Sequence, residues 1–175
     1  RSPYAVAKLC GHWTTVNYRE SYNMFACSGI LFNHESPLRG AEFVTRKITI
    51  GLSKVKLGQL DYLEIGNLDA RRDWGYAADY VEAMWRMLQQ DAPNDYVLAT
   101  GESHSVTDWL DIAFARAGLR WEDHVETDNS MFRTTDPCML LGNPHKAETE
   151  LEWKRTVEFE ELVDLMFDAD QERVF

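Results

Sequence analysis

The sequence reads Arg1-Ser2-Pro3-Tyr4-Ala5-Val6-Ala7-Lys8 at its start, a pattern that predicts a helix. Ser2 is a favourable N-cap residue, and a proline in the first helical turn costs no hydrogen bond. On a helix, Tyr4 and Lys8 lie on one face with their polar ends within reach of each other. A cation beside a phenol stabilises the phenolate, so Tyr4 is a candidate base near neutral pH. By spacing alone, such a pair is more often an ordinary solvated helix face.

Four further blocks give this pair a context. They read Leu31-Phe32-Asn33-His34-Glu35-Ser36-Pro37, Phe43-Val44-Thr45-Arg46-Lys47-Ile48, Gly66-Asn67-Leu68-Asp69-Ala70-Arg71-Arg72-Asp73-Trp74-Gly75 and Met84-Trp85-Arg86-Met87-Leu88-Gln89-Gln90. With residues 2–8, they resemble the extended branch of the short-chain dehydrogenase/reductase superfamily, and within it the GDP-mannose 4,6-dehydratases. Residues 33–37 and 72–75 resemble the dehydratases specifically, rather than the superfamily as a whole.

The order of the expected elements indicates an α/β protein. The patterns predict a helix over residues 3–21, a buried parallel strand over 23–32, a polar loop at 33–37, a helix over 43–57, a strand at 62–65, a loop at 71–75, a helix over 77–90, a strand at 96–100, a helix over 106–117 with a capping box at Ser105 and Asp108, and a final helix over 158–170. Alternating strands and helices favour right-handed crossovers. The resemblance implies the C-terminal part of an NAD(P)-binding Rossmann domain, formed by residues 1–39 and about 75–100. It would be interleaved with a smaller α/β nucleotide-sugar-binding lobe, formed by residues about 40–74 and 101–175.

Composition limits the classes of partner. The chain has 175 residues, 45% of them hydrophobic, and six tryptophans, which is enough apolar material for a core. Its formal net charge of -11 argues against binding to nucleic acid or to an anionic membrane surface. No apolar run is long enough to span a bilayer, so no membrane partner is expected. Positive charge nevertheless gathers between Arg39 and Arg72, which keeps an anionic nucleotide compatible with the acidic chain.

The three cysteines, Cys10, Cys27 and Cys138, indicate the redox environment. Their odd number and their spacing fit neither a disulfide framework nor a metal site, so no metal is expected. Unpaired thiols are typical of a reducing, cytosol-like compartment. We therefore expect a cytoplasmic protein. The resemblance also implies a homo-oligomer (a dimer or a tetramer) for the intact protein.

The resemblance also implies roles for individual residues. Lys8, His34 and Arg39 would contact NADP, and GDP-mannose would be the substrate. The implied substrate contacts are Asn33, Lys47, Arg72, Arg133 and Asp136. The chain departs from the family pattern at four positions, which have Leu38 for Arg, Thr134 for Pro, Asp136 for Glu and Glu152 for Gly. The implied role therefore transfers better for Arg133 than for Asp136.

Each of these residues also has an ordinary explanation. Without the motif, His34 reads as a plain loop histidine. Arg46 and Lys47 are expected in the first turn of a helix, where cations oppose the helix dipole, so an anionic partner is indicated, although a solvated basic face stays open. Arg72 suits a phosphate because its guanidinium fork matches phosphate oxygens, but a surface salt bridge with Asp73 is the alternative.

The activity that the resemblance implies is the NADP-dependent conversion of GDP-D-mannose to GDP-4-dehydro-6-deoxy-D-mannose by internal oxidation, elimination of water and reduction. Tyr4 would take the proton from the sugar 4-hydroxyl, while Lys8 would hold the nicotinamide ribose. The sequence has no glycine-rich dinucleotide fingerprint. The family's catalytic Thr and Glu, which precede the tyrosine, have no counterpart here. We therefore expect a C-terminal half that is inactive alone.

Two other interpretations stay open. The first is a non-catalytic nucleotide-sugar-binding or interaction module, which the missing glycine-rich loop favours for this polypeptide. The second is another nucleotide-sugar dehydratase or epimerase of the same branch, which residues 33–36 and 72–74 disfavour. Retention of Tyr4 and Lys8 favours the dehydratase.

Overall fold

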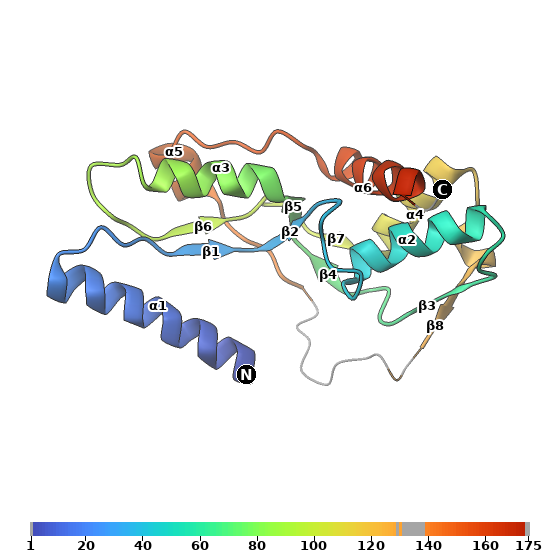
Figure 1. Ribbon diagram of the computed structural model, residues 1–175, viewed down its shortest axis with the longest axis horizontal. Helices are drawn as coiled ribbons and strands as arrows, with labels where there is room; N and C mark the ends of the chain where they lie inside the picture. Colours follow the sequence, from blue (N-terminus) through green and yellow to red (C-terminus); the bar gives the residue numbers. More distant parts are fainter. Residues whose placement is uncertain (1, 129, 131–138, 174–175) are drawn as a thin grey trace.

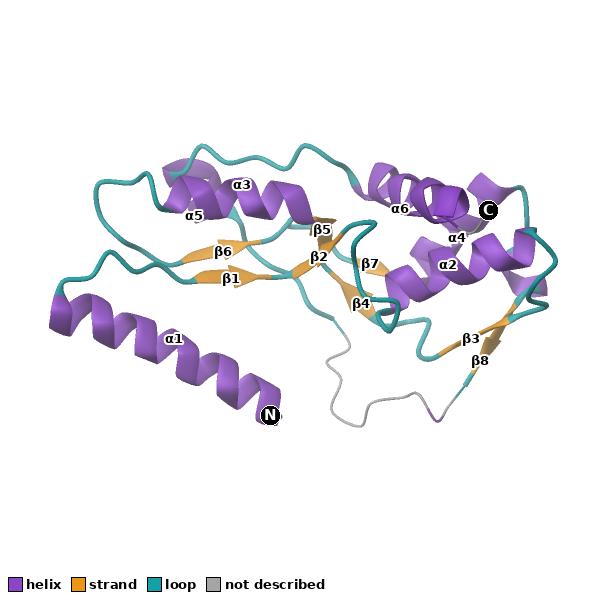
Figure 2. Ribbon diagram, in the orientation of Figure 1, coloured by secondary structure: helices purple, strands orange, loops and turns teal. Residues whose placement is uncertain are grey.

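The structure is a computed structural model that describes residues 2–128, 130 and 139–173. The elements are α1 (Pro3–Tyr22), β1 (Gly29–Leu31), β2 (Asn33–Glu35), α2 (Val44–Lys56), β3 (Leu63–Ile65), β4 (Arg71–Arg72), β5 (Trp74–Tyr76), α3 (Ala77–Met87), β6 (Tyr96–Leu98), β7 (His104–Ser105), α4 (Val106–Ala117), a 3-10 turn (Trp121–Asp123), β8 (Val125–Thr127), α5 (His145–Glu150) and α6 (Phe159–Arg173). Figure 2 shows short strands between longer helices, which is the predicted α/β class. None of the helices described is long and apolar enough to cross a membrane.

Helix α1 forms where its capping residues predict it. The Ser2 hydroxyl accepts a hydrogen bond of 3.1 Å from the N–H of Ala5, and Pro3 occupies the first turn. No residue of α1 is buried, and its apolar side chains Val6, Leu9 and Trp13 are exposed in the part of the chain that is described. Figure 1 shows α1 along the side of β1 and β6 that is opposite to α3 and α5.

An ion pair attaches α1 to the segment before β6. Arg19 donates two hydrogen bonds of 2.8 Å to the Asp95 carboxylate, which also accepts the N–H of Ser28 at 2.9 Å. The Arg19 guanidinium lowers the pKa of Asp95 to about 2, with the Ser28 bond acting in the same direction. The carboxylate therefore joins three segments: the end of α1, the approach to β1 and the approach to β6.

The strands associate in four pairs among the described residues. β1 with β6, β2 with β5 and β3 with β8 are parallel, whereas β4 with β7 is antiparallel. The prediction of loops at residues 33–37 and 71–75 is wrong where β2, β4 and β5 form. The reason is that β2 and β5 are each other's partners, and a pairing across about 40 residues leaves no periodic signal in segments of three residues. The strand predicted over 23–32 forms only at β1, and its first two residues are exposed rather than buried.

Two hydrophobic clusters stabilise the fold. In the larger, α2, α4 and α6 pack together, with Leu52, Trp109 and Met166 fully buried. The smaller contains residues of α3, β6 and α5, together with Trp153. Residues 147–153, assigned by the resemblance to the nucleotide-sugar lobe, thus pack with the α3 and β6 segments of the Rossmann part. The division of the chain into two lobes stays a proposal.

Helix α4 begins at a local sequence signal. At α4 the Ser105 hydroxyl accepts the N–H of Asp108 at 3.0 Å and the Asp108 carboxylate accepts the N–H of Ser105 at 2.7 Å, which confirms the predicted capping box. The helix predicted over 77–90 forms as α3, which buries Tyr80 and Met87 in the smaller cluster, while Val81 and Leu88 are exposed.

Candidate functional site

The two blocks that resemble the dehydratases are neighbours in space. In the parallel pair of β2 with β5, Asn33 lies opposite Trp74 and His34 lies opposite Gly75. Arg72 ends β4, two residues before Trp74. Residues 41 positions apart in the sequence thus meet near the centre of Figure 1.

The His34 ring is held from two sides. Its Nδ1 lies 2.9 Å from the Phe32 carbonyl oxygen, which makes Nδ1 the protonated nitrogen of the neutral ring because a carbonyl can only accept. The ring packs against Tyr80, with 5.8 Å between centroids. The other nitrogen, Nε2, is then an acceptor, and the half-buried imidazole has a fixed orientation. His34 lies in β2 rather than in the loop that the sequence predicts.

Arg39 lies in a small charged cluster beside β2. Its guanidinium lies 3.6 Å from the centroid of the Phe43 ring, and its Nε is 3.4 Å from a Glu35 oxygen. Glu35 is 1% exposed and accepts a hydrogen bond of 2.6 Å from the Thr45 hydroxyl. Burial raises the pKa of Glu35, and the Thr45 bond and the Arg39 charge only partly oppose this shift. A half-buried cation is thus held in place by a buried acid and an aromatic ring.

The surface Arg72–Asp73 salt bridge is not the environment that the structure gives Asp73. Asp73 is fully buried, and its carboxylate accepts hydrogen bonds from Thr100, Gly101 and Gly142. Arg72 is half-buried, and its Nη1 donates to the Arg71 carbonyl at 2.8 Å. Asp73 therefore fixes the backbone from which the Arg72 side chain projects.

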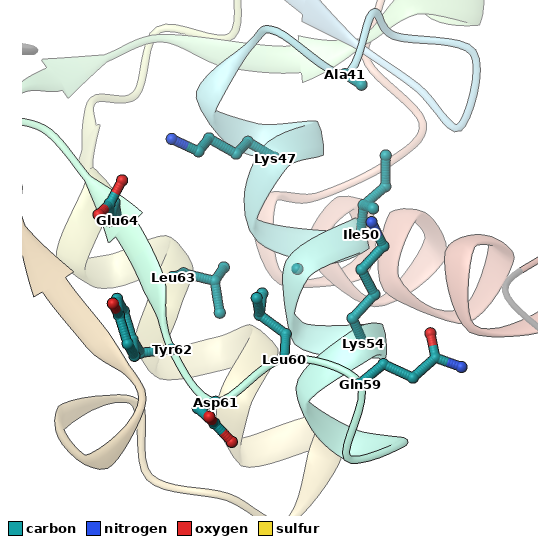
Figure 3. A pocket seen from close by; sticks show the side chains of 11 residues that line it. Ala41, Lys47, Ile50, Lys54, Gln59, Leu60, Asp61, Tyr62, Leu63 and Glu64 are labelled. Atoms are coloured by element: carbon teal, nitrogen blue, oxygen red, sulfur yellow. The ribbon is translucent and has the colours of Figure 1, made fainter.

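Lys47 lines an open pocket of about 560 Å³ between α2 and the segment that leads into β3. The lining residues are Ala41, Lys47, Ile50, Gly51, Lys54, Gln59, Leu60, Asp61, Tyr62, Leu63 and Glu64. Figure 3 shows Leu60 and Leu63 in the middle of the pocket, with the Lys47 ammonium reaching toward the side where Glu64 lies. The pocket combines an apolar floor with charged groups of both signs at its rim.

Tyr4 and Lys8 have the relation that their spacing predicts. The Lys8 Nζ lies 5.6 Å from the centroid of the Tyr4 ring. Tyr4 is 71% exposed, and Lys8 is exposed as well. In the described part of the chain, no other segment encloses this pair.

Comparison with known proteins identifies the family. A sequence profile described as GDP-mannose 4,6 dehydratase matches residues 1–166. The chain belongs to the GDP-mannose 4,6-dehydratase family. It is 57% identical over 172 residues to GDP-mannose 4,6 dehydratase 1 of Arabidopsis thaliana, and 50% identical over 189 residues to the GDP-mannose 4,6 dehydratase of Homo sapiens. Each alignment covers 98% of this chain but only 48% and 51% of the relative, so the chain spans about half the length of these curated relatives.

A solved structure shows the fold of this dehydratase-family chain. The structure of RMD from Pseudomonas aeruginosa complexed with NADPH superposes with a TM-score of 0.90 at 19% identity, covering 99% of this chain and 57% of that one. The mixed α/β fold is thus that of about half of this solved structure, and the predicted α/β fold class is confirmed.

The structure places the site residues suggested by the dehydratase-family resemblance in different parts of the fold. Asn33 and His34 lie on β2, which pairs with β5, and Arg72 lies on β4, two residues before the first residue of β5. Arg39 lies beside Glu35 of β2, and Lys47 lines the separate pocket. Arg133 and Asp136 lie outside the described residues.

Sequence reasoning missed the buried acids that support this site, Glu35 and Asp73. Each sits inside a motif block next to a proposed ligand contact, which is the only signal that singles it out. For Arg46 the anionic partner indicated by its place in the helix is a residue of the chain itself, Asp170.

Proposed function

We propose that the intact protein is a GDP-mannose 4,6-dehydratase, which converts GDP-D-mannose to GDP-4-dehydro-6-deoxy-D-mannose with NADP. The observation that carries the proposal is the family match across residues 1–166. The pairing of β2 with β5 supports it, because it unites the two blocks that resemble the dehydratases.

The proposed cofactor contacts are Lys8, His34 and Arg39. The residues fit an anionic dinucleotide, because Arg39 offers a guanidinium whose charge Glu35 only partly offsets across 3.4 Å, and Lys8 offers an exposed ammonium. His34 offers an acceptor at Nε2. When bound, NADP supplies the hydride acceptor and donor of the internal redox cycle.

Tyr4 is the proposed base. As a phenolate it would take the proton from the sugar 4-hydroxyl, and the Lys8 ammonium lies 5.6 Å from the centre of its ring. The ketone formed at C4 acidifies the C5 proton, so that water can leave across C5–C6. The elimination needs a further acid and base, for which the family uses a Thr and a Glu without a counterpart in this sequence.

The proposed contacts to GDP-mannose are Asn33, Lys47, Arg72, Arg133 and Asp136. A guanidinium fork at Arg72 suits phosphate oxygens, and Lys47 brings an ammonium to a pocket with room for a ligand group. We also propose that the intact protein is a homo-oligomer, since the uncovered apolar residues of α1 suit a further interface. The proposed location is the cytoplasm.

The test is product formation. The intact protein is incubated with GDP-mannose and NADP, and the 4-keto-6-deoxy sugar nucleotide is detected by NMR. Its absence, with GDP-mannose still bound, would favour the alternative of a nucleotide-sugar-binding module. That alternative draws support from the exposure of Tyr4, which nothing in the described chain encloses.

A further inference from the structure

Arg46, in the first turn of α2, joins two other parts of the chain. Its Nε and Nη2 donate to the Asp170 carboxylate of α6 at 2.7 to 2.9 Å. Its Nη1 donates to the carbonyl oxygens of Pro37 and Arg39, the latter at 2.8 Å. The guanidinium therefore links the last turn of α6 to the loop of residues 36–40, which carries Arg39.

This contact is buried and has further support. The side chain of Arg46 is 12% exposed and that of Asp170 is 1% exposed. The Thr49 hydroxyl donates to Asp170 at 2.7 Å, and Arg173 donates to the Pro37 carbonyl. Both charges oppose the dipole of their own helix, a cation in a first turn and an anion in a last turn. Helix preference therefore does not explain why these two residues occupy these positions, whereas the ion pair between α2 and α6 does.

We propose that Arg46 and Asp170 are positioning residues for the cofactor contact at Arg39. The inference rests on the proposed function, in which Arg39 contacts NADP. The Arg39 side chain is held by Glu35 and Phe43, while its backbone carbonyl is held by Arg46. Ordering both ends of a long side chain in advance removes an entropy cost that binding would otherwise carry.

Two variants test the contact in the intact protein. Arg46→Lys keeps a charge for Asp170 but lacks the nitrogen, Nη1, that donates to both loop carbonyls, and Asp170→Asn weakens the anchor. We expect each to raise the KM for NADP about tenfold while kcat stays within about twofold. The matched controls are Arg116→Lys and Asp168→Asn, an exposed ion pair of 2.9 Å between α4 and α6, and both should leave the KM unchanged.

A double-mutant cycle separates positioning from general destabilisation. If Arg46 acts through Arg39, Arg46→Lys raises the KM for NADP in the parent and adds nothing in an Arg39→Ala background. An equal rise in both backgrounds overturns the proposal, because Arg46 then acts by another route.

Hydrogen exchange tests the loop with no ligand present. The N–H of Leu38 donates to the Ser36 hydroxyl oxygen, and the N–H of Arg39 donates to the Ser36 carbonyl at 2.9 Å. We expect these two amides to exchange about tenfold faster in Arg46→Lys and Asp170→Asn, and at the parent rate in the controls. Unchanged exchange overturns the positioning of the loop. A parent protein that binds no NADP overturns instead the proposed function, and with it the cofactor role of Arg39.

Discussion

The Asp73 carboxylate accepts a hydrogen bond of 3.2 Å from the backbone N–H of Gly142, 69 positions further along the chain. It also accepts the N–H and the hydroxyl of Thr100, both at 2.8 Å, and the N–H of Gly101 at 3.1 Å. One buried anion thus joins β5, the end of β6 and the approach to α5. This arrangement holds the backbone beneath Arg72, a proposed substrate contact.

The first prediction is that Asp73→Asn lowers the free energy of unfolding by about 2–4 kcal/mol, because one amide oxygen cannot satisfy donors that now use two carboxylate oxygens. The measurement is urea unfolding of the parent and the variant. Asp69→Asn is the control, since Asp69 is exposed, and it should change stability by less than about 0.5 kcal/mol. Equal losses in the two variants would contradict the role of Asp73.

Close packing of α2 on β3 gives the second prediction. A Cβ added at Gly51 would lie 2.3 Å from a terminal carbon of the buried Leu63, so Gly51→Ala should destabilise the protein by about 1–3 kcal/mol. Gly11, within α1, has no atom within 4 Å of an added Cβ, so Gly11→Ala should stabilise by about 0.5–1 kcal/mol. Thermal unfolding of both variants checks the pair, and the explanation fails if Gly51→Ala is neutral.

Local signals predict the helices better than the strands. Ser2, Pro3 and the Ser105–Asp108 capping box place the starts of α1 and α4 correctly, because a cap is a contact between residues close in sequence. The pairing of Asn33 with Trp74 depends on residues far apart, so β2 and β5 were not predictable from pattern. For the same reason the anchor of Arg46 could be expected as an anion, but not identified as Asp170.

Only those residues of the candidate site that belong to a recognisable motif could be predicted from the sequence. The resemblance points to Asn33, His34, Arg39 and Arg72, and three of these lie on paired or adjoining strands. It says nothing of Glu35 or Asp73, whose importance appears only through their burial and their partners. An acid that supports a ligand contact from within the fold has the same sequence signature as a surface acid.

The third prediction concerns pH. Burial raises the folded-state pKa of Glu35 above its ordinary value of 4.5, so ionisation costs more in the folded than in the unfolded protein. The stability associated with the neutral acid is complete below the ordinary value and is lost as pH rises through the raised value. Glu35→Gln keeps an acceptor for Thr45 but removes this ionisation, so the variant should gain stability relative to the parent as the pH rises above the ordinary value of 4.5. Urea unfolding of both proteins below and above that pH checks the prediction, and a difference in stability that does not change with pH would contradict it.

The fourth prediction concerns the proposed base. In the intact protein Tyr4→Phe should lower kcat by about 10²–10⁴-fold and leave GDP-mannose affinity nearly unchanged, because only a proton acceptor is lost. Tyr22→Phe, an exposed tyrosine on the same helix, is the matched control and should keep full activity. Turnover of the Tyr4 variant within about twofold of the parent would remove Tyr4 from the mechanism.

The last prediction separates ligand binding from structure at Arg72. If the Arg72 guanidinium donates hydrogen bonds to a GDP phosphate, Arg72→Ala should weaken GDP binding in the intact protein by about 1.5–3 kcal/mol for each charge-assisted hydrogen bond lost. Calorimetry measures the affinity. Arg72→Lys should recover only part of this, because an ammonium cannot make the two-pronged contact.

The neighbouring residue on β4 supplies the control. Arg71 is 44% exposed and lies 3.7 Å from Asp108, so Arg71→Ala should cost at most about 1 kcal/mol of stability and leave GDP affinity unchanged. Successive side chains of a strand point to opposite faces, so the two arginines cannot serve the same ligand equally. A purely structural Arg72 would show the reverse of the binding result, with a lower melting temperature and unchanged GDP affinity. If Lys replaces Arg72 without loss of affinity, the two-pronged contact is wrong even if the site is right.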